Sequence, residues 1–382
     1  FECTDWIAQQ QVRGRFPGAL WAVMRSDAWT GRDLSSGPNR REAARAVNLL
    51  QHYAVEKTRL GIPLLFAEEC LHGIMAIGAT TFPEGLGMGA TWSPALIRRA
   101  SEVTADELRA AGGHIAFGPV LNLAREPRWG RCEENYGEDP YLTARLGVAA
   151  VEGLQHGGGI ISTLKHYVAY GVPEGGHNGA PAHLGPRELH NTFMPAFEAA
   201  VRAGARSLMT SYSAIDGVPP TGDAEVLNAT LREAWGLKGV VISDSSAVPD
   251  LKDAHRLAAT YEEAAALALK AGVDFDLCPD HRHGYRDALL AALEQGRVTM
   301  DDLDAAVLRI LQLKFDLGVM DRPFADENAP MLESQPEAHR AIAREAAQKS
   351  VVLLKNDRDL LPLRSGPLKV ALIGPNADDV YN

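Results

Sequence analysis

Several apolar segments of the sequence end on side chains that can bind or transfer protons. The most informative is Asp244, which follows the apolar run 239–243 and carries a carboxylate suited to a nucleophile or a general base. A carboxylate at the end of a strand also caps helices, so Asp244 alone leaves both roles open. Three other apolar runs end in the same way, on Glu68-Glu69, on Lys165-His166 and on Thr210-Ser211-Tyr212.

These groups can act together only if their strands share one edge of a sheet. Candidate strands lie at 19–24, 63–66, 114–120, 160–164, 207–210, 240–243 and 273–277. Helical patterns lie at 40–57, 94–111, 188–203, 261–271 and 301–315, the last with Leu303, Val307, Leu311 and Phe315 as its expected buried face.

Alternating strands and helices predict an α/β fold with a parallel sheet and outer helices. About seven repeats favour a (β/α)8-like TIM-type barrel over an open sheet. The carboxyl ends of all barrel strands meet at one rim, where such enzymes place their sites. Four polar strand ends at one rim are harder to explain by helix capping than one.

Composition divides the chain into a barrel domain at 1–320, a Pro- and Asp-rich linker at 321–336 and the beginning of a second α/β domain at 337–382. In the third part a helix is expected from 337 to 348, with strands at 350–354 and 369–373. Because the sequence starts at Phe1 and stops soon after an apolar strand, we expect a piece of a longer polypeptide.

The charge balance argues against nucleic acid or an anionic membrane as the main partner. The 382 residues include 38 Lys and Arg against 49 Asp and Glu, a net charge of −11. No segment is apolar for the length of a membrane span, and no signal-peptide pattern is seen, which leaves cytoplasm, periplasm and secretion open. The oligomeric state is also open.

The sequence gives no strong sign of a metal or nucleotide site. Four cysteines, Cys3, Cys70, Cys132 and Cys278, are too far apart for a zinc motif and are expected to be free thiols. His281 and His283 beside Asp280 are better explained as a polar loop, because no partner cluster matches them. No glycine-rich phosphate loop is present.

The segment 125–140 is dense in charge and too irregular for a helix. Within it, Arg128 and Arg131 flank Trp129. Guanidinium groups bind hydroxyls and carboxylates, and an aromatic face packs on the C–H surface of a sugar. This loop therefore predicts recognition of an oxygen-rich ligand, although a solvated loop would have a similar composition.

Taken together, these segments resemble glycoside hydrolase family 3, in the branch of β-glucosidases and β-xylosidases. The resemblance rests on RLGIPLLFAEECLHG at 59–73, TFPEGLGMGATW at 81–92, VLNLAREPRWGRCEENYGEDP at 120–140, TLKHYVAYG at 163–171, MTSYSAIDGVP at 209–219 and WGLKGVVISD at 235–244. SVVLLKNDRDLLPL at 350–363 and IGPNA at 373–377 resemble the start of the family's second domain.

The resemblance implies a retaining, exo-acting β-glycosidase that needs no metal or cofactor. It implies that Asp244 is the nucleophile, which attacks the anomeric carbon of a β-linked glycoside or oligosaccharide to form a covalent glycosyl-enzyme. It also implies a set of residues around the terminal sugar, namely Glu69, Arg131, Lys165, His166, Met209 and Tyr212. Arg131 and Lys165 are expected to favour the ionised form of Asp244.

The resemblance leaves three matters open. The family's usual general acid lies on a loop of the second domain, which we expect beyond residue 382, and Glu174 resembles a binding position instead. The loop 171–186 holds His177 and His183 but no Asp, which disfavours the N-acetylglucosaminidase branch. Ser245 replaces the aromatic residue that often follows the nucleophile, so a β-xylosidase is an alternative to a β-glucosidase.

Two rival classes remain. An inactive carbohydrate-binding fragment without its general acid would bind sugar and not turn it over. A phosphate-binding barrel such as an aldolase would use Lys165 to form a Schiff base.

Overall fold

Six parallel strands form the centre of the molecule and position the polar strand ends. The computed structural model of the chain describes residues 16–278, 284–333, 336–374 and 377. The sheet has the order β1-β2-β3-β4-β5-β6, so each strand pairs with the next one in the chain. The strands are β1 Ala19–Trp21, β2 Leu65–Glu69, β3 Ile115–Phe117, β4 Ile161–Tyr167, β5 Ser207–Thr210 and β6 Val240–Ile242.

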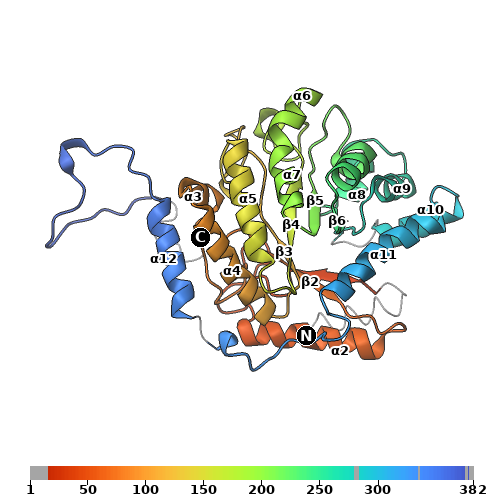
Figure 1. Ribbon diagram of the computed structural model, residues 1–382, viewed down its shortest axis with the longest axis horizontal. Helices are drawn as coiled ribbons and strands as arrows, with labels where there is room; N and C mark the ends of the chain where they lie inside the picture. The colour runs from red at the N-terminus through yellow and green to blue at the C-terminus, as the bar shows by residue number, and fades with distance from the viewer. Residues whose placement is uncertain (1–15, 279–283, 334–335, 375–376, 378–382) are drawn as a thin grey trace.

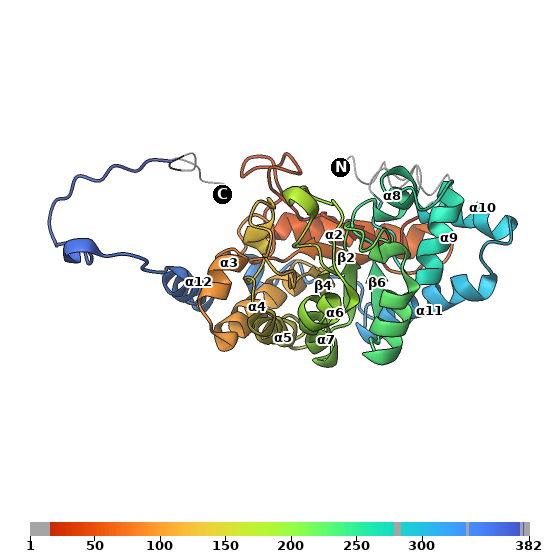
Figure 2. The same ribbon diagram turned by 90° about the horizontal axis from the view of Figure 1, so that it is seen from above.

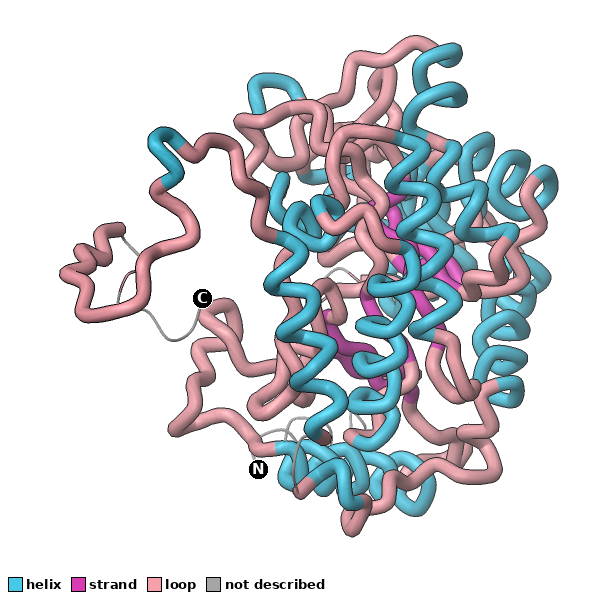
Figure 3. The backbone as a smooth tube through the Cα atoms, turned by 60° about the vertical axis from the view of Figure 1, so that its left-hand side comes forward, coloured by secondary structure: helices cyan, strands magenta, loops and turns pink. Residues whose placement is uncertain are grey.

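Helices connect and cover these strands. The α-helices are α2 Arg40–Lys57, α3 Gly85–Ala90, α4 Pro94–Ala110, α5 Pro140–Leu154, α6 Pro186–Glu188, α7 Pro195–Arg202, α8 Ala247–Asp253, α9 Tyr261–Ala271, α10 Tyr285–Glu294, α11 Met300–Asp316 and α12 Glu337–Ser350, and π-helices lie at Leu189–Phe193 and Glu225–Ala234. Figure 1 shows α4, α5 and α7 on one side of the strands and α8 to α11 on the other, with α2 crossing below. Figure 3 shows the strands enclosed by this layer of helices.

The ends of the main helices follow from local sequence signals. The Asn39 side chain accepts the Glu42 backbone N–H, and the Glu42 carboxylate accepts the Asn39 N–H, which forms a capping box before α2. Ser93 caps α4, and Pro94 occupies its first turn, where a missing N–H costs nothing. Gly272 ends α9 with a φ of 111°, a conformation that favours glycine.

The predicted parallel α/β fold is confirmed, but the six strands form a half-barrel, and the described residues do not close it into a ring. The expected seventh strand at 273–277 is reduced to a single bridge between Ile242 and Phe275. Within the described residues no ladder joins this segment to β1. Residues 295–299 are the whole connection between α10 and α11, which leaves no room for another strand there.

The buried face of α11 differs from the prediction. Val307 and Phe315 are 50% and 59% exposed, whereas Ala306 and Leu313 are buried. A spacing of four residues advances about 400° around a helix, so the expected stripe turns by about 40° at each step. Over four such residues the expected stripe therefore turns away from the face of α11 that packs against the sheet.

The segment after the half-barrel first packs against it and then leaves it. Ala325 in the expected linker is bonded to the Asn48 side chain of α2. Its backbone N–H donates to Asn48 Oδ1 at 2.8 Å, and its carbonyl accepts from Asn48 Nδ2 at 3.0 Å. Ala346 of α12 is buried in the cluster that α4 and α5 also line. Figure 2 shows the chain beyond α12 extending away from the body of the molecule.

The strands expected at 350–354 and 369–373 are not formed. Leu354 and Ile373 are 91% and 89% exposed, and the described residues around them offer no strand to pair with. A strand needs a neighbour to bond its backbone groups, so the apolar pattern alone does not produce one. The division into two domains therefore stays a prediction.

Candidate active site

The carboxylate of Asp244 lies just past the end of β6, and the residue is 8% exposed. Its Oδ1 accepts the backbone N–H of Ser245 at 2.7 Å and the hydroxyl of Tyr212 at 3.0 Å. The Tyr212 hydroxyl also lies 2.8 Å from the Ser245 carbonyl, so its single proton is shared. The other oxygen, Oδ2, is buried and has no hydrogen-bond partner in the described structure.

Lys165 and His166 both reach the site although they are neighbours in one strand. Successive side chains of a regular strand point to opposite faces. The register of β4 against β5 shifts in this stretch, and such an irregularity re-aims side chains. The Nε2 of His166 lies 3.7 Å from Oδ2 of Asp244, and the Nζ of Lys165 lies 2.6 Å from Oε2 of Glu69 at the end of β2.

Arg131 enters the site from the loop that connects β3 to α5. Glu134 holds it through two contacts, from Nε to Oε1 at 2.5 Å and from Nη2 to Oε2 at 2.8 Å. Nη2 also lies 3.1 Å from Nε2 of His166, and Nη1 lies 3.3 Å from the hydroxyl of Tyr170. The guanidinium is thereby fixed beside His166, and its charge acts on Asp244.

His166 is neutral and does not protonate Asp244. Burial and the positive charges of Arg131 and Lys165 hold the pKa of His166 well below its usual value. A guanidinium can only donate, so Nε2 of His166 accepts from Arg131 and has no proton to give. The Oδ2 atom of Asp244 thus stays unengaged.

The electrostatics of Asp244 differ in part from the expectation. Burial raises the pKa of Asp244 above its usual value, and the charges of Arg131 and Lys165 lower it by less. The hydrogen bonds from Ser245 and Tyr212 lower the pKa as well. The two cations therefore act in the expected direction, but burial outweighs them, since it removes water from the charged form.

Two expected site residues lie farther from the carboxylate. Met209 of β5 is buried among the interior side chains of the sheet, and its strand partner is Ile242, so it lies one layer beneath Asp244. Glu174 lies on an exposed loop, where its Oε2 is 3.2 Å from Nε2 of His183. The described contacts give Glu174 no link to the carboxylate of Asp244.

The expected sugar platform at Trp129 is wrong. Trp129 is 2% exposed, and its Nε1 donates to Oδ1 of Asn178 at 2.9 Å. Its neighbour Arg128 points to solvent and pairs with Glu126 at 2.7 Å. Apolar packing holds the indole inside the fold, so of the two arginines only Arg131 reaches the site.

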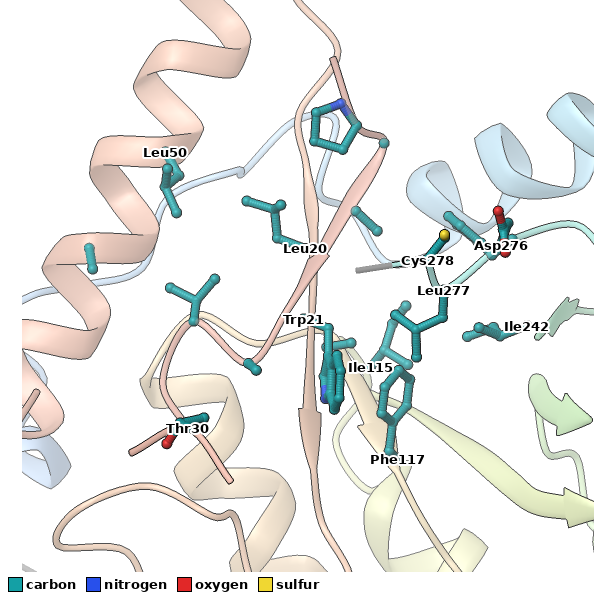
Figure 4. Close-up of a pocket in the computed structure, with 18 of the residues that line it drawn as sticks. Leu20, Trp21, Thr30, Leu50, Ile115, Phe117, Ile242, Asp276, Leu277 and Cys278 are labelled. Atoms are coloured by element: carbon teal, nitrogen blue, oxygen red, sulfur yellow. The ribbon is translucent and has the colours of Figure 1, made fainter. Parts of the chain in front are cut away.

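A large cavity lies beside the site, at the open edge of the half-barrel. Its volume is about 1310 Å³, and it is bounded by β1 and the segment 273–278. Figure 4 shows Trp21, Phe117 and Leu277 converging on it. The Nζ of Lys165 lies 5.9 Å from the centre of the Phe117 ring, which also lines the cavity.

The sequence matches the family model described as "Glycosyl hydrolase family 3 N terminal domain" over residues 30–313. The chain belongs to glycoside hydrolase family 3. The motifs quoted between residues 59 and 244 lie within this match, whereas those at 350–363 and 373–377 lie outside it and stay predictions. Asp244, Glu69, Arg131, Lys165, His166 and Tyr212 all fall inside the matched range.

Relatives within family 3 include both β-glucosidases and β-xylosidases. The periplasmic β-glucosidase of Salmonella typhimurium is 34% identical over 342 residues, which are 87% of this chain and 44% of that protein. A β-xylosidase of Formosa agariphila is 38% identical over 344 residues, 84% of this chain and 47% of that protein. The chain spans less than half the length of these relatives.

Solved structures of family 3 enzymes share the fold. A β-glucosidase from Erythrobacter marinus superposes with a TM-score of 0.82 at 39% identity, over 86% of this chain and 44% of that one. A β-glucosidase from Listeria innocua in complex with glucose gives a TM-score of 0.78 at 35% identity, over 84% of this chain and 45% of that one.

Several neighbours of this polar cluster were not singled out from the sequence. They are Tyr170, Glu134 and Asn122. Tyr170 and Glu134 stand inside the quoted motifs, but no spacing rule shows which member of a motif touches Arg131. Asn122 accepts the backbone N–H of His166 at 3.0 Å, a contact that depends on β3 and β4 lying side by side.

Other expectations concern metals, thiols and membranes. In the described ranges no three His, Cys, Asp or Glu side chains gather closely enough to hold a metal ion. Cys70 and Cys132 are free thiols and Cys278 is buried, whereas Cys3, Asp280, His281 and His283 lie outside the described residues. None of the described helices has the length and apolar content needed to span a bilayer.

Proposed function

We propose that this chain carries the nucleophile and the sugar-binding groups of a retaining, exo-acting β-glycosidase that removes terminal β-D-glucosyl residues. The observation that carries the proposal is the buried, unpartnered Oδ2 of Asp244, whose sister oxygen Oδ1 accepts from the Tyr212 hydroxyl and the Ser245 N–H. A nucleophile needs one oxygen free of competing bonds. Family membership supports the same assignment.

In the proposed reaction, Oδ2 of Asp244 attacks the anomeric carbon as the bond to the leaving oxygen breaks. The product is a covalent glycosyl-enzyme, which water then hydrolyses with overall retention. Because Asp244 is 8% exposed, the sugar reaches Oδ2 only when a neighbouring side chain moves. Arg131, whose side chain is 26% exposed, is the most accessible neighbour in the ion-pair cluster.

The remaining polar groups are proposed to hold the sugar ring. Glu69 accepts hydrogen bonds from sugar hydroxyl groups, and Arg131, Lys165 and His166 face the same ring as hydrogen-bond donors or acceptors. Met209 and Tyr212 line the same subsite. The general acid is proposed to lie on the second domain implied by the family resemblance, which would begin at 337 after a barrel at 1–320 and a linker at 321–336. We also propose that the barrel closes in the complete protein.

A β-xylosidase is the second candidate. Ser245 follows Asp244 where an aromatic side chain would support a glucose ring, and a relative named as a β-xylosidase is 38% identical. Xylose lacks the hydroxymethyl group on C5, so a shallower subsite suits it. Rates on matched glucosides and xylosides decide between the two.

Covalent trapping tests the nucleophile without needing the general acid. The reagent is 2,4-dinitrophenyl 2-deoxy-2-fluoro-β-D-glucoside, whose leaving phenolate departs unprotonated. Oδ2 forms a bond to C1, the bond from C1 to the phenolate oxygen breaks, and the fluorine slows hydrolysis of the product. Mass spectrometry of the digested protein is expected to find the fluoroglucosyl group on the peptide that contains Asp244.

The controls separate the rival classes. Asp244→Ala should bind glucose and take up no label, whereas Glu174→Ala should be labelled like the unmodified protein. A protein that binds glucose but is never labelled would be a carbohydrate-binding module. Reduction by borohydride with a keto-phosphate that modifies Lys165 would favour the aldolase class. Label on any residue other than Asp244 overturns the assignment.

A further inference from the structure

Glu68 is a buried acid at the centre of the site's supporting structure, and the proposed reaction does not use it. It precedes Glu69 in β2, so its side chain points to the other face of the sheet, toward the covering helices. Glu68 is 0% exposed, and Met24, Cys70 and Ile74 are buried in the apolar cluster on that face. A carboxyl group in such surroundings is retained only if it makes hydrogen bonds.

The carboxyl group of Glu68 bonds two backbone groups that the sheet leaves unpaired. Its Oε2 accepts the N–H of Met24 at 3.2 Å, and its Oε1 accepts the N–H of Glu69 at 3.0 Å. The ladder between β1 and β2 ends at the pair Trp21 and Ala67. Glu68 therefore continues the connection between β1 and β2 past the point where the ladder stops.

This connection determines what surrounds the carboxylate of Glu69. Arg25 follows Met24, and its Nη1 lies 3.7 Å from Oε1 of Glu69. Lys165 binds Oε2 of the same carboxylate at 2.6 Å. Each oxygen of the Glu69 carboxylate thus faces one cation. The position of Arg25 in turn depends on the segment that Glu68 anchors.

We infer that Glu68 is a positioning residue of this site, which fixes the Glu69 carboxylate for sugar hydroxyl groups by joining the backbones of Met24 and Glu69. The inference rests on the proposed function, because it assigns Glu69 to the sugar. Glu68 acts through Glu69 and does not touch the substrate.

The charge state of Glu68 agrees with this role. The pKa of Glu68 is raised to about 8, because burial and the nearby Glu69 carboxylate raise it by more than Arg25 and the two backbone N–H groups lower it. The Cys70 thiol also lies near Glu68, and its own pKa is raised well above the usual value. Glu68 is therefore uncharged at neutral pH, and its ionisation in alkaline solution places a second negative charge beside Glu69.

The test compares Glu68→Gln with the unmodified protein in the trapping reaction. The amide nitrogen of Gln cannot accept, so one of the two backbone N–H groups loses its acceptor. The segment that carries Arg25 is then less firmly joined to Glu69, and we expect about a tenfold higher half-saturating concentration of the fluoroglucoside. The maximal labelling rate should change less than twofold, because Asp244 is untouched.

The pH profile provides a second readout. Labelling of the unmodified protein at low reagent concentration should fall with a midpoint near the Glu68 pKa of about 8. Glu68→Gln should lack this alkaline loss, because Gln does not ionise. The matched control is Glu107→Gln, since Glu107 is also buried and accepts a backbone N–H, that of Thr80 at 2.7 Å, away from the site.

The outcomes are distinct. Equal half-saturation and pH profiles in Glu68→Gln, Glu107→Gln and the unmodified protein overturn the inference and leave the proposed function intact. Absence of labelling in the unmodified protein overturns the proposed function and this inference with it. If Glu68→Gln does not fold, hydrogen exchange decides: fast exchange of the Met24 and Glu69 amides in the unmodified protein contradicts the inference, and protection of both supports it.

Discussion

The hydroxyl of Tyr212 lies 3.0 Å from Oδ1 of Asp244, while Oδ2 of the same carboxylate has no partner in the described structure. The two oxygens of Asp244 are therefore not equivalent. Tyr212 and the Ser245 N–H orient the carboxylate through Oδ1. This arrangement leaves Oδ2 available for the proposed attack on the sugar. Removal of the Tyr212 hydroxyl should therefore change the labelling rate measurably.

Tyr212→Phe should slow labelling and shift its acid limit. A hydrogen bond to a charged group contributes about 1.5–3 kcal/mol, so the labelling rate should fall by about tenfold or more. Tyr212 lowers the pKa of Asp244, so its removal raises that pKa and moves the acid limb to higher pH. The check is the labelling rate from pH 4 to 8, with the exposed Tyr141→Phe as control. An unmoved acid limb would contradict the role of this hydroxyl.

Glu134→Gln should weaken sugar binding by releasing Arg131. The Glu134 side chain is 13% exposed and binds the guanidinium through both oxygens. A neutral amide keeps only one acceptor, so Arg131 loses its fixed orientation. The expected result is a several-fold rise in the half-saturating reagent concentration.

The same loop supplies the control for this variant. Glu126 also binds an arginine through both oxygens, but Arg128 is 69% exposed. Exposed pairs contribute about 0–1 kcal/mol, so Glu126→Gln should leave sugar binding and stability nearly unchanged. Equal effects of the two variants would show that loop disturbance, and not Arg131, is responsible.

Substitutions of Lys165 and Glu69 should be strongly coupled in their effects on the free energy of unfolding. Both side chains are largely buried, at 3% and 12% exposure. Lys165→Met leaves the Glu69 carboxylate with only the more distant Arg25, which should cost about 3–5 kcal/mol of the free energy of unfolding. The double variant Lys165→Met/Glu69→Gln should cost less than the sum of the single variants.

Urea unfolding measures this cycle. The exposed pair Arg202 and Glu198, at 58% and 39% exposure, provides a control cycle with coupling of about 0.3–0.5 kcal/mol. Additive costs at Lys165 and Glu69 would contradict a direct interaction.

Lys314 should give the protein a distinct pH dependence of stability. It is 2% exposed and donates to the carbonyls of Gly18, at 3.0 Å, and Pro63. Burial lowers its pKa from 10.5 to about 8. Between these values the unfolded chain binds the extra proton, so this group makes stability rise with pH there and destabilises the fold below pH 8.

Lys314→Met removes this contribution. The stability of the variant relative to the unmodified protein should therefore fall as pH rises from about 8 to 10, measured by urea unfolding. Lys349→Met, at a side chain 54% exposed, should show no such trend. A constant difference for Lys314→Met across this range would contradict the lowered pKa.

The sequence by itself determined the class of fold and singled out most of the polar side chains that the structure brings near Asp244. The alternation of short apolar runs with amphipathic helices predicts parallel strands, and the helices at 40–57 and 261–271 have the predicted ends. Polar groups at strand ends predict a common rim because parallel strands all point the same way. Asp244 contacts Tyr212 and His166 there, and Lys165 binds Glu69 close enough for its charge to act on Asp244.

Only the tertiary structure determined which side chains contact one another, and whether burial or neighbouring charges dominate a pKa. Trp129 looked like a sugar platform, but its packing buries it, and Glu68 looked like a rim residue beside Glu69, but the alternation of β2 turns its side chain toward the covering helices. The pKa of Asp244 depends on a balance between burial and two cations from distant segments. Such balances depend on distances between residues far apart in the chain, which local patterns do not contain.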